Sequence, residues 1–315
     1  MMLNRRHIRV KVMQTMYAFK GSESDDFSKD QKFLLFSIDN MYNLYLLLMS
    51  LLIEVQKRAE SDLQKKRNKH LATKEDIDPN KKFVNNQILK LLRENTQLKE
   101  QLEEKKITNW ELDDEYVDII FKDIISSDLY NDYMKTRVSD FKEDKDFIVD
   151  VFKDIIAPND KLYDYMEDKN LTWLDDLPTV NTTILKLLRK VKASAPENYF
   201  TPKLYKDVED KQFAIDLFKK TLLNRTVINE EIDKKTKNWD SDRIANVDYV
   251  LLQMAICELK NFSSIPVKVT INEYLEISKE YSTPKSSIFI NGILDKLVKE
   301  YEAEGVLNKV GRGLM

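Results

Sequence analysis

The chain has 315 residues, of which 33% are charged, and a formal net charge of −3. This length is enough for one large domain or two smaller ones with a hydrophobic core. With five glycines, two histidines and Cys257 as its single cysteine, the sequence lacks the residues of glycine-rich phosphate loops, disulfide frameworks and thiolate zinc sites. We therefore predict no catalytic residues, no cofactor, no metal site and no enzymatic activity.

The composition predicts an all-α protein. Glycine and proline are scarce, whereas Leu, Lys, Glu, Ile and Asp are abundant, which is typical of long helices joined by short loops. The chain opens without the apolar segment of a signal peptide, and a single cysteine fits a reducing compartment, so we expect a cytoplasmic protein. The apolar stretch MYNLYLLLMSLLI (41–53) is too short to span a bilayer and is predicted to be a buried core helix.

Charge is distributed unevenly along the chain. Counting Lys and Arg against Asp and Glu gives +5 for residues 1–20, −8 for 21–200 and 0 for 201–315. The opening stretch NRRHIRVKVMQTMYAF (4–19) contains no carboxylate, because the first acidic residue is Glu23. We expect a helix whose apolar side faces a bundle and whose cations overhang its edge without being neutralised. The cations are Arg5, Arg6, Arg9, Lys11 and, just beyond the stretch, Lys20.

The middle of the chain predicts further helices. Residues 31–69 read as an apolar helix that becomes polar, and DPN at 78–80 interrupts the pattern. The next apolar residues alternate at spacings of three and four, which predicts a heptad seam with one polar core position. Two heptads can form an intramolecular helical hairpin, which we favour, or a coiled-coil dimer. The seam residues are Ile88, Leu91, Asn95, Leu98 and Leu102.

Residues 111–176 are strongly acidic. They contain 20 Asp or Glu and 8 Lys or Arg, a net charge of −12. Such a surface repels a phosphate backbone. It is either solvated surface or a site for a protein partner.

Residues 239–302 predict a bundle of three helices. Asp240 or Ser241 can cap the first helix. The sequences SSIP and STPKSS separate the helices, and each helix has apolar residues at helical spacing.

This stretch resembles the C-terminal signature of the transcription termination/antitermination factor NusB family. The resemblance is close over residues 3–20 and 213–302 and weak over 21–200. At two positions where the family commonly has Arg and Tyr, this chain has Gln253 and Cys257. The matching residues are Trp239, Arg243, Asp248, Glu258-Leu259, Ile265-Pro266, Ile271-Asn272-Glu273 and FINGILDK at 289–296.

The resemblance implies two helical bundles, with an additional helical insertion in this chain. We expect an Arg-rich helix at 1–20, an enlarged helical region at 21–200, and a bundle with a short basic tail at 201–315. It also implies binding of single-stranded RNA of the boxA type, together with the small-subunit ribosomal protein NusE. In the family this complex joins RNA polymerase during antitermination of ribosomal RNA transcription.

The candidate RNA contacts combine cations and aromatic rings. Guanidinium groups suit phosphates and can stack on bases, and an aromatic ring adds about 1–3 kcal/mol per stacked base. Phe289 is included by the resemblance, and it can instead be buried. Asn272 and Glu273 are expected to fix the bundle. A second possibility is a helical protein–protein scaffold with lost or weak RNA binding. The candidates are Arg5, Arg6, Arg9, Lys11, Tyr17, Lys285 and Phe289.

Overall fold

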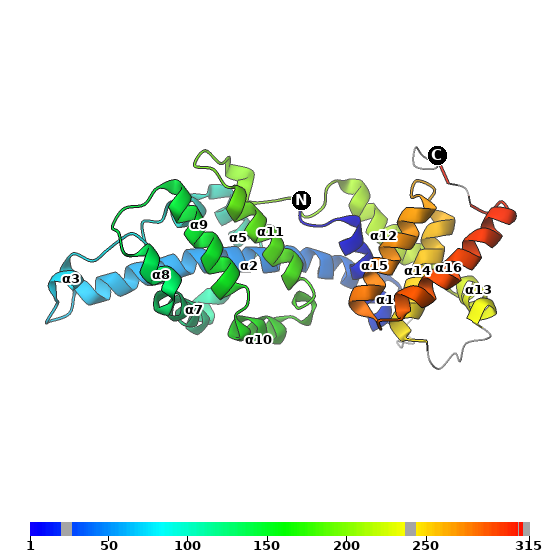
Figure 1. Cartoon of the computed structure of the whole chain (residues 1–315), viewed down its shortest axis with the longest axis horizontal. Helices are drawn as coiled ribbons and strands as arrows, with labels where there is room; N and C mark the ends of the chain where they lie inside the picture. The colour runs from blue at the N-terminus through cyan, green and yellow to red at the C-terminus, as the bar shows by residue number, and fades with distance from the viewer. Residues whose placement is uncertain (20–26, 237–243, 308, 311–315) are drawn as a thin grey trace. The chain divides into compact units, whose positions relative to one another are not determined.

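The computed structural model describes residues 1–19, 27–236, 244–307 and 309–310. Across these residues the chain forms helices and no strand, which confirms the all-α prediction (Figure 1). Six residues named in the sequence analysis lie outside the described residues. They are Lys20, Glu23, Trp239, Asp240, Ser241 and Arg243.

The chain divides into two compact units. The terminal unit consists of residues 3–38 and 205–315, and the inserted unit consists of residues 39–204. The first division falls within helix α2 (Phe27–Arg67), whose residues 27–38 belong to the terminal unit. Our predicted boundaries at 20 and 200 lie before these divisions and stay a prediction.

The terminal unit is built around helix α14 (Asn246–Asn261), which packs against five other helices. Residues 250–259 of α14 are all buried, since apolar side chains occupy nearly every side of this helix. The predicted bundle of three helices at 239–302 corresponds to α14, α15 and α16. The helices around α14 are α1 (Arg5–Ala18), α12 (Val208–Leu223), α13 (Arg225–Thr236), α15 (Val267–Tyr281) and α16 (Ser286–Ala303).

The inserted unit is assembled on the later part of α2. Tryptophans from distant segments anchor to this helix through their indole N–H groups. Trp110 donates to the carbonyl of Leu47 at 3.0 Å, and Trp173 donates to the carbonyl of Asn40 at 2.9 Å. The other helices are α3 (Lys74–Ile77), α4 (Gln87–Glu94), α5 (Thr96–Glu104), α6 (Asn109–Leu112), α7 (Asp114–Ser126), α8 (Asp128–Tyr133), α9 (Phe141–Val151), α10 (Asp160–Lys169) and α11 (Leu177–Lys190).

The apolar stretch at 41–53 is a buried core segment, as predicted. Leu44, Tyr45, Leu46 and Leu47 have no exposed side-chain surface. Among the described residues, α2 is the one helix long and apolar enough to cross a membrane, but 83% of its apolar window is buried inside the protein. Its hydrophobicity is thus accounted for by packing within the fold.

The predicted heptad seam is wrong, because the helix breaks at its polar position. Asn95 ends α4 and caps α5, and its side-chain oxygen accepts the Leu98 N–H at 2.7 Å. Its amide group donates to the carbonyl of Glu197 at 2.9 Å. Asparagine competes for backbone hydrogen bonds and therefore favours a cap over a helix interior.

We predict that Asn95→Leu destabilises the protein, although it completes an apolar seam. The variant loses the N-cap and leaves the carbonyl of Glu197 without this donor, so the free energy of unfolding should fall by about 1–2 kcal/mol. Urea denaturation measures the change, and Asn95→Ser, which keeps a capping oxygen, is the matched control. An increase in stability would instead support a continuous heptad helix.

Candidate nucleic-acid interface

Helix α1 presents the arginines of the N-terminal stretch from a well-defined start. Asn4 is its N-cap, and the Asn4 side-chain oxygen accepts the N–H of His7 at 2.9 Å. In return, Nδ1 of His7 accepts the N–H of Asn4 at 3.4 Å. This reciprocal capping box fixes the first turn, which carries Arg5 and Arg6 and leads into the turn of Arg9.

Arg9 is buried and paired with a buried carboxylate. Its Nε and Nη2 atoms donate to the two carboxylate oxygens of Glu258 at 2.8 and 2.7 Å. Thr270 and Tyr274 donate to the same carboxylate at 2.8 and 3.1 Å. Burial works against the charged form of Arg9, but the hydrogen bonds and charge of Glu258 outweigh it and raise the pKa of Arg9. The pair therefore ties α1 to α14 and α15.

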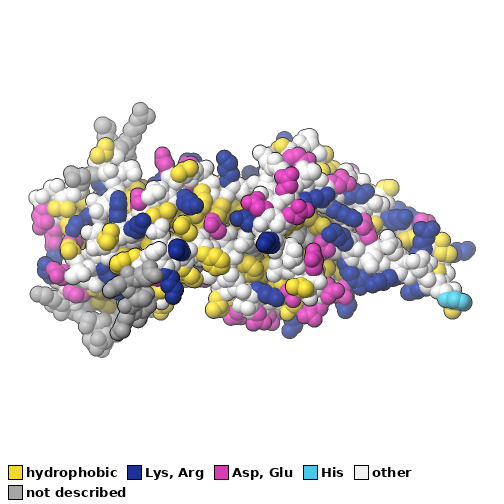
Figure 2. Space-filling model, turned by 180° about the vertical axis from the view of Figure 1, so that it is seen from behind, with side chains coloured by type: hydrophobic (Ala, Val, Ile, Leu, Met, Phe, Trp, Pro, Cys, Tyr) yellow, Lys and Arg dark blue, Asp and Glu magenta, His cyan; other side chains and the backbone are white. Residues whose placement is uncertain are grey.

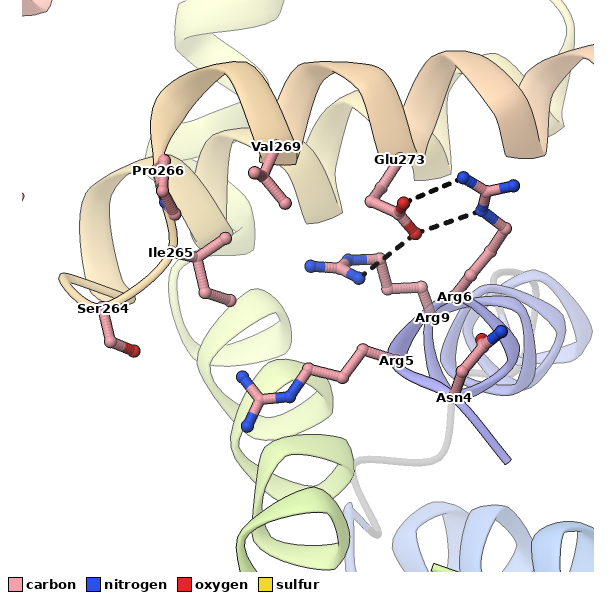
Figure 3. Close-up of a pocket in the computed structure, with 9 residues that line it drawn as sticks. All are labelled: Asn4, Arg5, Arg6, Arg9, Ser264, Ile265, Pro266, Val269 and Glu273. Atoms are coloured by element: carbon pink, nitrogen blue, oxygen red, sulfur yellow. Dashed lines mark hydrogen bonds and ion pairs between the residues drawn. The ribbon is translucent and has the colours of Figure 1, made fainter. Parts of the chain in front are cut away.

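Arg5 and Arg6 also have carboxylate partners. Arg6 donates from Nε and Nη2 to Glu273 at 3.1 and 2.9 Å, and Nη1 of Arg9 lies 3.5 Å from Glu273 (Figure 3). Nε of Arg5 donates to Asp210 at 3.0 Å. The guanidinium of Arg5 also lies 4.9 Å from the ring centroid of Phe213, within cation–π distance.

The expectation that the N-terminal arginines are not neutralised is wrong. Each of the three lies within ion-pair distance of a carboxylate from α12, α14 or α15. These partners are 205 to 267 residues away in sequence, so the acid-free start of the chain gave no sign of them. The expectation that Glu273 fixes the bundle is confirmed by its pairing with Arg6.

An open cavity of about 550 Å³ lies beside these arginines. Figure 3 shows Arg5 pointing toward Ser264 and Ile265 in this pocket. The terminal nitrogens of Arg5, and Nη1 of Arg6, have no hydrogen-bond partner among the described residues. The pocket thus keeps hydrogen-bond donors, although its formal charges are balanced. Its lining consists of Asn4, Arg5, Arg6, Arg9, Ser264, Ile265, Pro266, Val269 and Glu273.

The other predicted contacts differ in accessibility. Lys11 is 3% exposed and Arg9 is 2% exposed, so neither presents its charge to solvent. Tyr17 is 49% exposed, Lys285 is exposed, and Phe289 is half-buried with contacts to other residues. In Figure 1, the end of α1 and the start of α16 both lie toward the lower side of the terminal unit.

The sequence did not predict that Asp210, Glu258 and Glu273 pair with the three arginines. One signal was available for Glu258, since it is the lone acid in the apolar stretch VLLQMAICEL (250–259). A carboxylate on a fully buried helix requires a cation or several donors. No comparable feature distinguished Asp210 from the two other acids of its helix, Glu209 and Asp216.

A family model described as the NusB family matches residues 182–299. The protein named transcription antitermination protein NusB from Salinibacter ruber (strain DSM 13855 / M31) is 43% identical over 112 residues, 36% of this chain and 70% of that protein. The chain belongs to the NusB family. This confirms the resemblance for the C-terminal part, over a matched range of 182–299, whereas the resemblance over residues 3–20 stays a prediction. Membership also agrees with the prediction of a non-enzymatic protein.

Two further proteins with the same name are similar over shorter ranges. The NusB of Chloroherpeton thalassium is 42% identical over 109 residues, 35% of this chain and 52% of that protein. The NusB of Desulfitobacterium hafniense is 46% identical over 87 residues, 28% of this chain and 59% of that protein. The chain thus spans little more than half of these two relatives. A solved structure of T. maritima NusB is 31% identical, covers 36% of this chain and 80% of that one, and gives a TM-score of 0.29.

Both departures from the NusB signature are buried on α14. Gln253 donates from its amide to Asn229 at 2.6 Å, and burial raises the pKa of the Cys257 thiol to about 11. Cys257 is therefore a packed, unreactive thiol at neutral pH. Gln253 serves the packing of α14 against α13.

We predict that Arg9→Met strongly destabilises the terminal unit. The substitution leaves the Glu258 carboxylate buried without its cation, which should lower the free energy of unfolding by about 3–5 kcal/mol. The double variant Arg9→Met/Glu258→Leu removes both charges and should recover part of the loss. Chemical denaturation of the single and double variants measures this coupling. A double variant as unstable as the sum of its singles would contradict it.

The His7 imidazole should make stability depend on pH. Burial is the main cause that lowers the pKa of His7, and the charge of Arg6 lowers it further. The folded state therefore favours neutral His7, whose Nδ1 accepts the capping bond. Stability should be complete above the unfolded pKa of about 6.5 and decline as pH falls below it. Urea denaturation at several pH values, compared with His7→Gln, should show a weaker decline for the variant. Equal pH dependence would refute the assignment.

Proposed function

We propose that this NusB-family chain is an RNA-binding transcription antitermination protein. Its ligand is single-stranded RNA of the boxA type, bound together with the ribosomal protein NusE during ribosomal RNA transcription. The resulting complex joins RNA polymerase in the cytoplasm. The family membership and the names of the curated relatives support the role in antitermination, and the pocket beside α1 supports the RNA site.

The observation that carries the RNA proposal is the set of unused donors in the pocket. The terminal nitrogens of Arg5 face an open cavity of about 550 Å³, whereas Arg6 lines the cavity and holds Glu273 through Nε and Nη2. Guanidinium nitrogens held by a carboxylate on one edge can still donate to a phosphate or base on the other. Because Glu273 and Asp210 hold these guanidiniums in place, less side-chain freedom is lost on binding.

Tyr17 and Phe289 supply the stacking part of the proposed site. Tyr17 exposes nearly half of its surface on the last turn of α1. Phe289 lies in the first turn of α16, four residues after the exposed N-cap Lys285. Single-stranded RNA is recognised largely by stacking of unpaired bases on such rings. Of the predicted contacts, Arg5, Arg6, Tyr17, Lys285 and Phe289 therefore form the proposed direct contacts, whereas Arg9 and Lys11 support α1 from within.

A second candidate function is a protein–protein scaffold with weak or lost RNA binding. The neutralisation of Arg5, Arg6 and Arg9 favours this alternative, since balanced charges give little long-range attraction for RNA. The net charge of −12 across 111–176 favours it too. RNA titration separates the two functions.

We predict that Tyr17→Ala weakens binding of boxA-like single-stranded RNA by about 1–3 kcal/mol, which is about 5- to 150-fold. Phe289→Ala should weaken it in the same direction. Fluorescence anisotropy with labelled RNA, with and without NusE, measures the affinity. Lys299→Gln, an exposed position on α16, is the matched control and should bind normally. Unchanged affinity in both aromatic variants would favour the scaffold.

The salt dependence should be modest. With Arg5, Arg6 and Lys285 as the accessible cations, log K should fall with log[salt] at a slope of about −2. Arg5→Gln should make this slope shallower by about 0.7. A slope of log K against log[salt] near zero would show that the pocket does not contact RNA. Equal slopes in Arg5→Gln and Lys299→Gln would show the same.

A further inference from the structure

A cationic surface on the inserted unit has no role in the function proposed so far. Residues 177–196 contain no Asp or Glu, although acids make up 54 of the 315 residues of the chain. Most of this stretch forms helix α11, whose buried side consists of Val180, Ile184 and Leu188. The α11 cationic face is defined by the exposed residues Lys186, Arg189, Lys190 and Lys192.

The cations of this face are not neutralised by ion pairs. No carboxylate of the described residues lies within 4.0 Å of any of the four side-chain charges. Elsewhere in the inserted unit, many cations do have partners, as Arg58 has Asp118 and Arg93 has Glu60. Figure 2 shows another face of the molecule, on which Lys and Arg side chains are interspersed with Asp and Glu over the inserted unit.

The helix dipole does not account for this face by itself. Cations are favourable in the last turn of a helix, which explains Arg189 and Lys190. Lys186 lies one turn earlier and Lys192 lies beyond the end of α11, and Thr182 occupies the same side one turn before Lys186. The exposed side thus offers positive charge and hydroxyl donors, the groups that contact phosphate oxygens in nucleic-acid complexes.

We propose that the α11 cationic face binds the phosphate backbone of single-stranded RNA. It would be a second contact on the same RNA that the terminal unit binds. The choice of RNA over another polyanion rests on the proposed function. The inference that this face binds a polyanion rests only on its unpaired cations. The acidic segment at 111–176 ends at Asp176, directly before α11, and should repel RNA from the surfaces that it forms. Binding at α11 would be independent of base sequence.

The test compares two charge-matched variants of the full chain. The first variant removes the α11 cationic face. It carries Lys186→Gln, Arg189→Gln, Lys190→Gln and Lys192→Gln. Its control removes four other exposed cations of the inserted unit, Lys105→Gln/Lys122→Gln/Lys142→Gln/Lys161→Gln. Both lower the net charge equally, so a difference between them reports the location of the charge. Circular dichroism and thermal unfolding check that both remain folded.

The probe is a labelled single-stranded RNA that extends a boxA-like segment by an unstructured oligouridine tail. The α11 variant should bind it at least tenfold more weakly at low salt, and its slope of log K against log[salt] should be shallower by about 2–3. The control should stay within about twofold of the native chain. Equal effects of the two variants, or no loss in the α11 variant, would overturn the proposal and point to a protein partner or no partner.

A third arm separates this proposal from the proposed function. The boxA-like segment without its tail should bind the α11 variant and the native chain similarly, while Tyr17→Ala weakens its binding. In one outcome, Tyr17→Ala leaves the affinity for both RNAs unchanged while the α11 variant still binds the tailed RNA more weakly. That result would contradict the proposed RNA site on the terminal unit and support the α11 cationic face. If the tailed RNA binds no more tightly than the short one, the α11 face fails.

Discussion

The buried pair of Arg9 and Glu258 is the interaction on which the terminal unit depends. A carboxylate with no exposed surface is compatible with folding only when donors surround it, and Glu258 accepts from Arg9, Thr270 and Tyr274. Those donors come from α1 and α15, whereas Glu258 belongs to α14. Closing this network therefore sets the positions of three helices relative to one another.

The same pattern of ion pairs continues along α1 from the core to the surface. Arg6 and Arg5 continue the row of ion pairs outward, from full burial at Arg9 to side chains that are 36% and 39% exposed. The inner arginine is structural, and Arg5 keeps nitrogens at the pocket that have no hydrogen-bond partner among the described residues. One run of arginines thus serves packing at Arg9 and, in the proposed function, RNA binding at its exposed end. A neutralised site of this kind gains its specificity from hydrogen-bond geometry and stacking more than from long-range attraction.

The inserted unit follows a different principle, in which one apolar helix organises many short ones. Residues 44–53 of α2 are all buried, and indole N–H groups from distant segments bond to carbonyls of this helix. Short helices such as α4 and α5 are each too short to be stable alone, so their packing provides the stability. The charge of this unit is also divided, since an acidic segment precedes the acid-free α11.

The sequence by itself determined the helical class, the buried stretch at 41–53 and, through the motif at 258–296, the family. These features are local, because helix periodicity and short motifs involve neighbouring residues. Only the tertiary structure decided that Arg5, Arg6 and Arg9 are neutralised, since their partners lie more than 200 residues away. It also decided the break at Asn95, where the cap and the bond to Glu197 outweigh a heptad spacing. Charge counts along a sequence cannot show which side chains form ion pairs in the folded protein. Those ion pairs decide whether a basic stretch is exposed for binding or is part of a core.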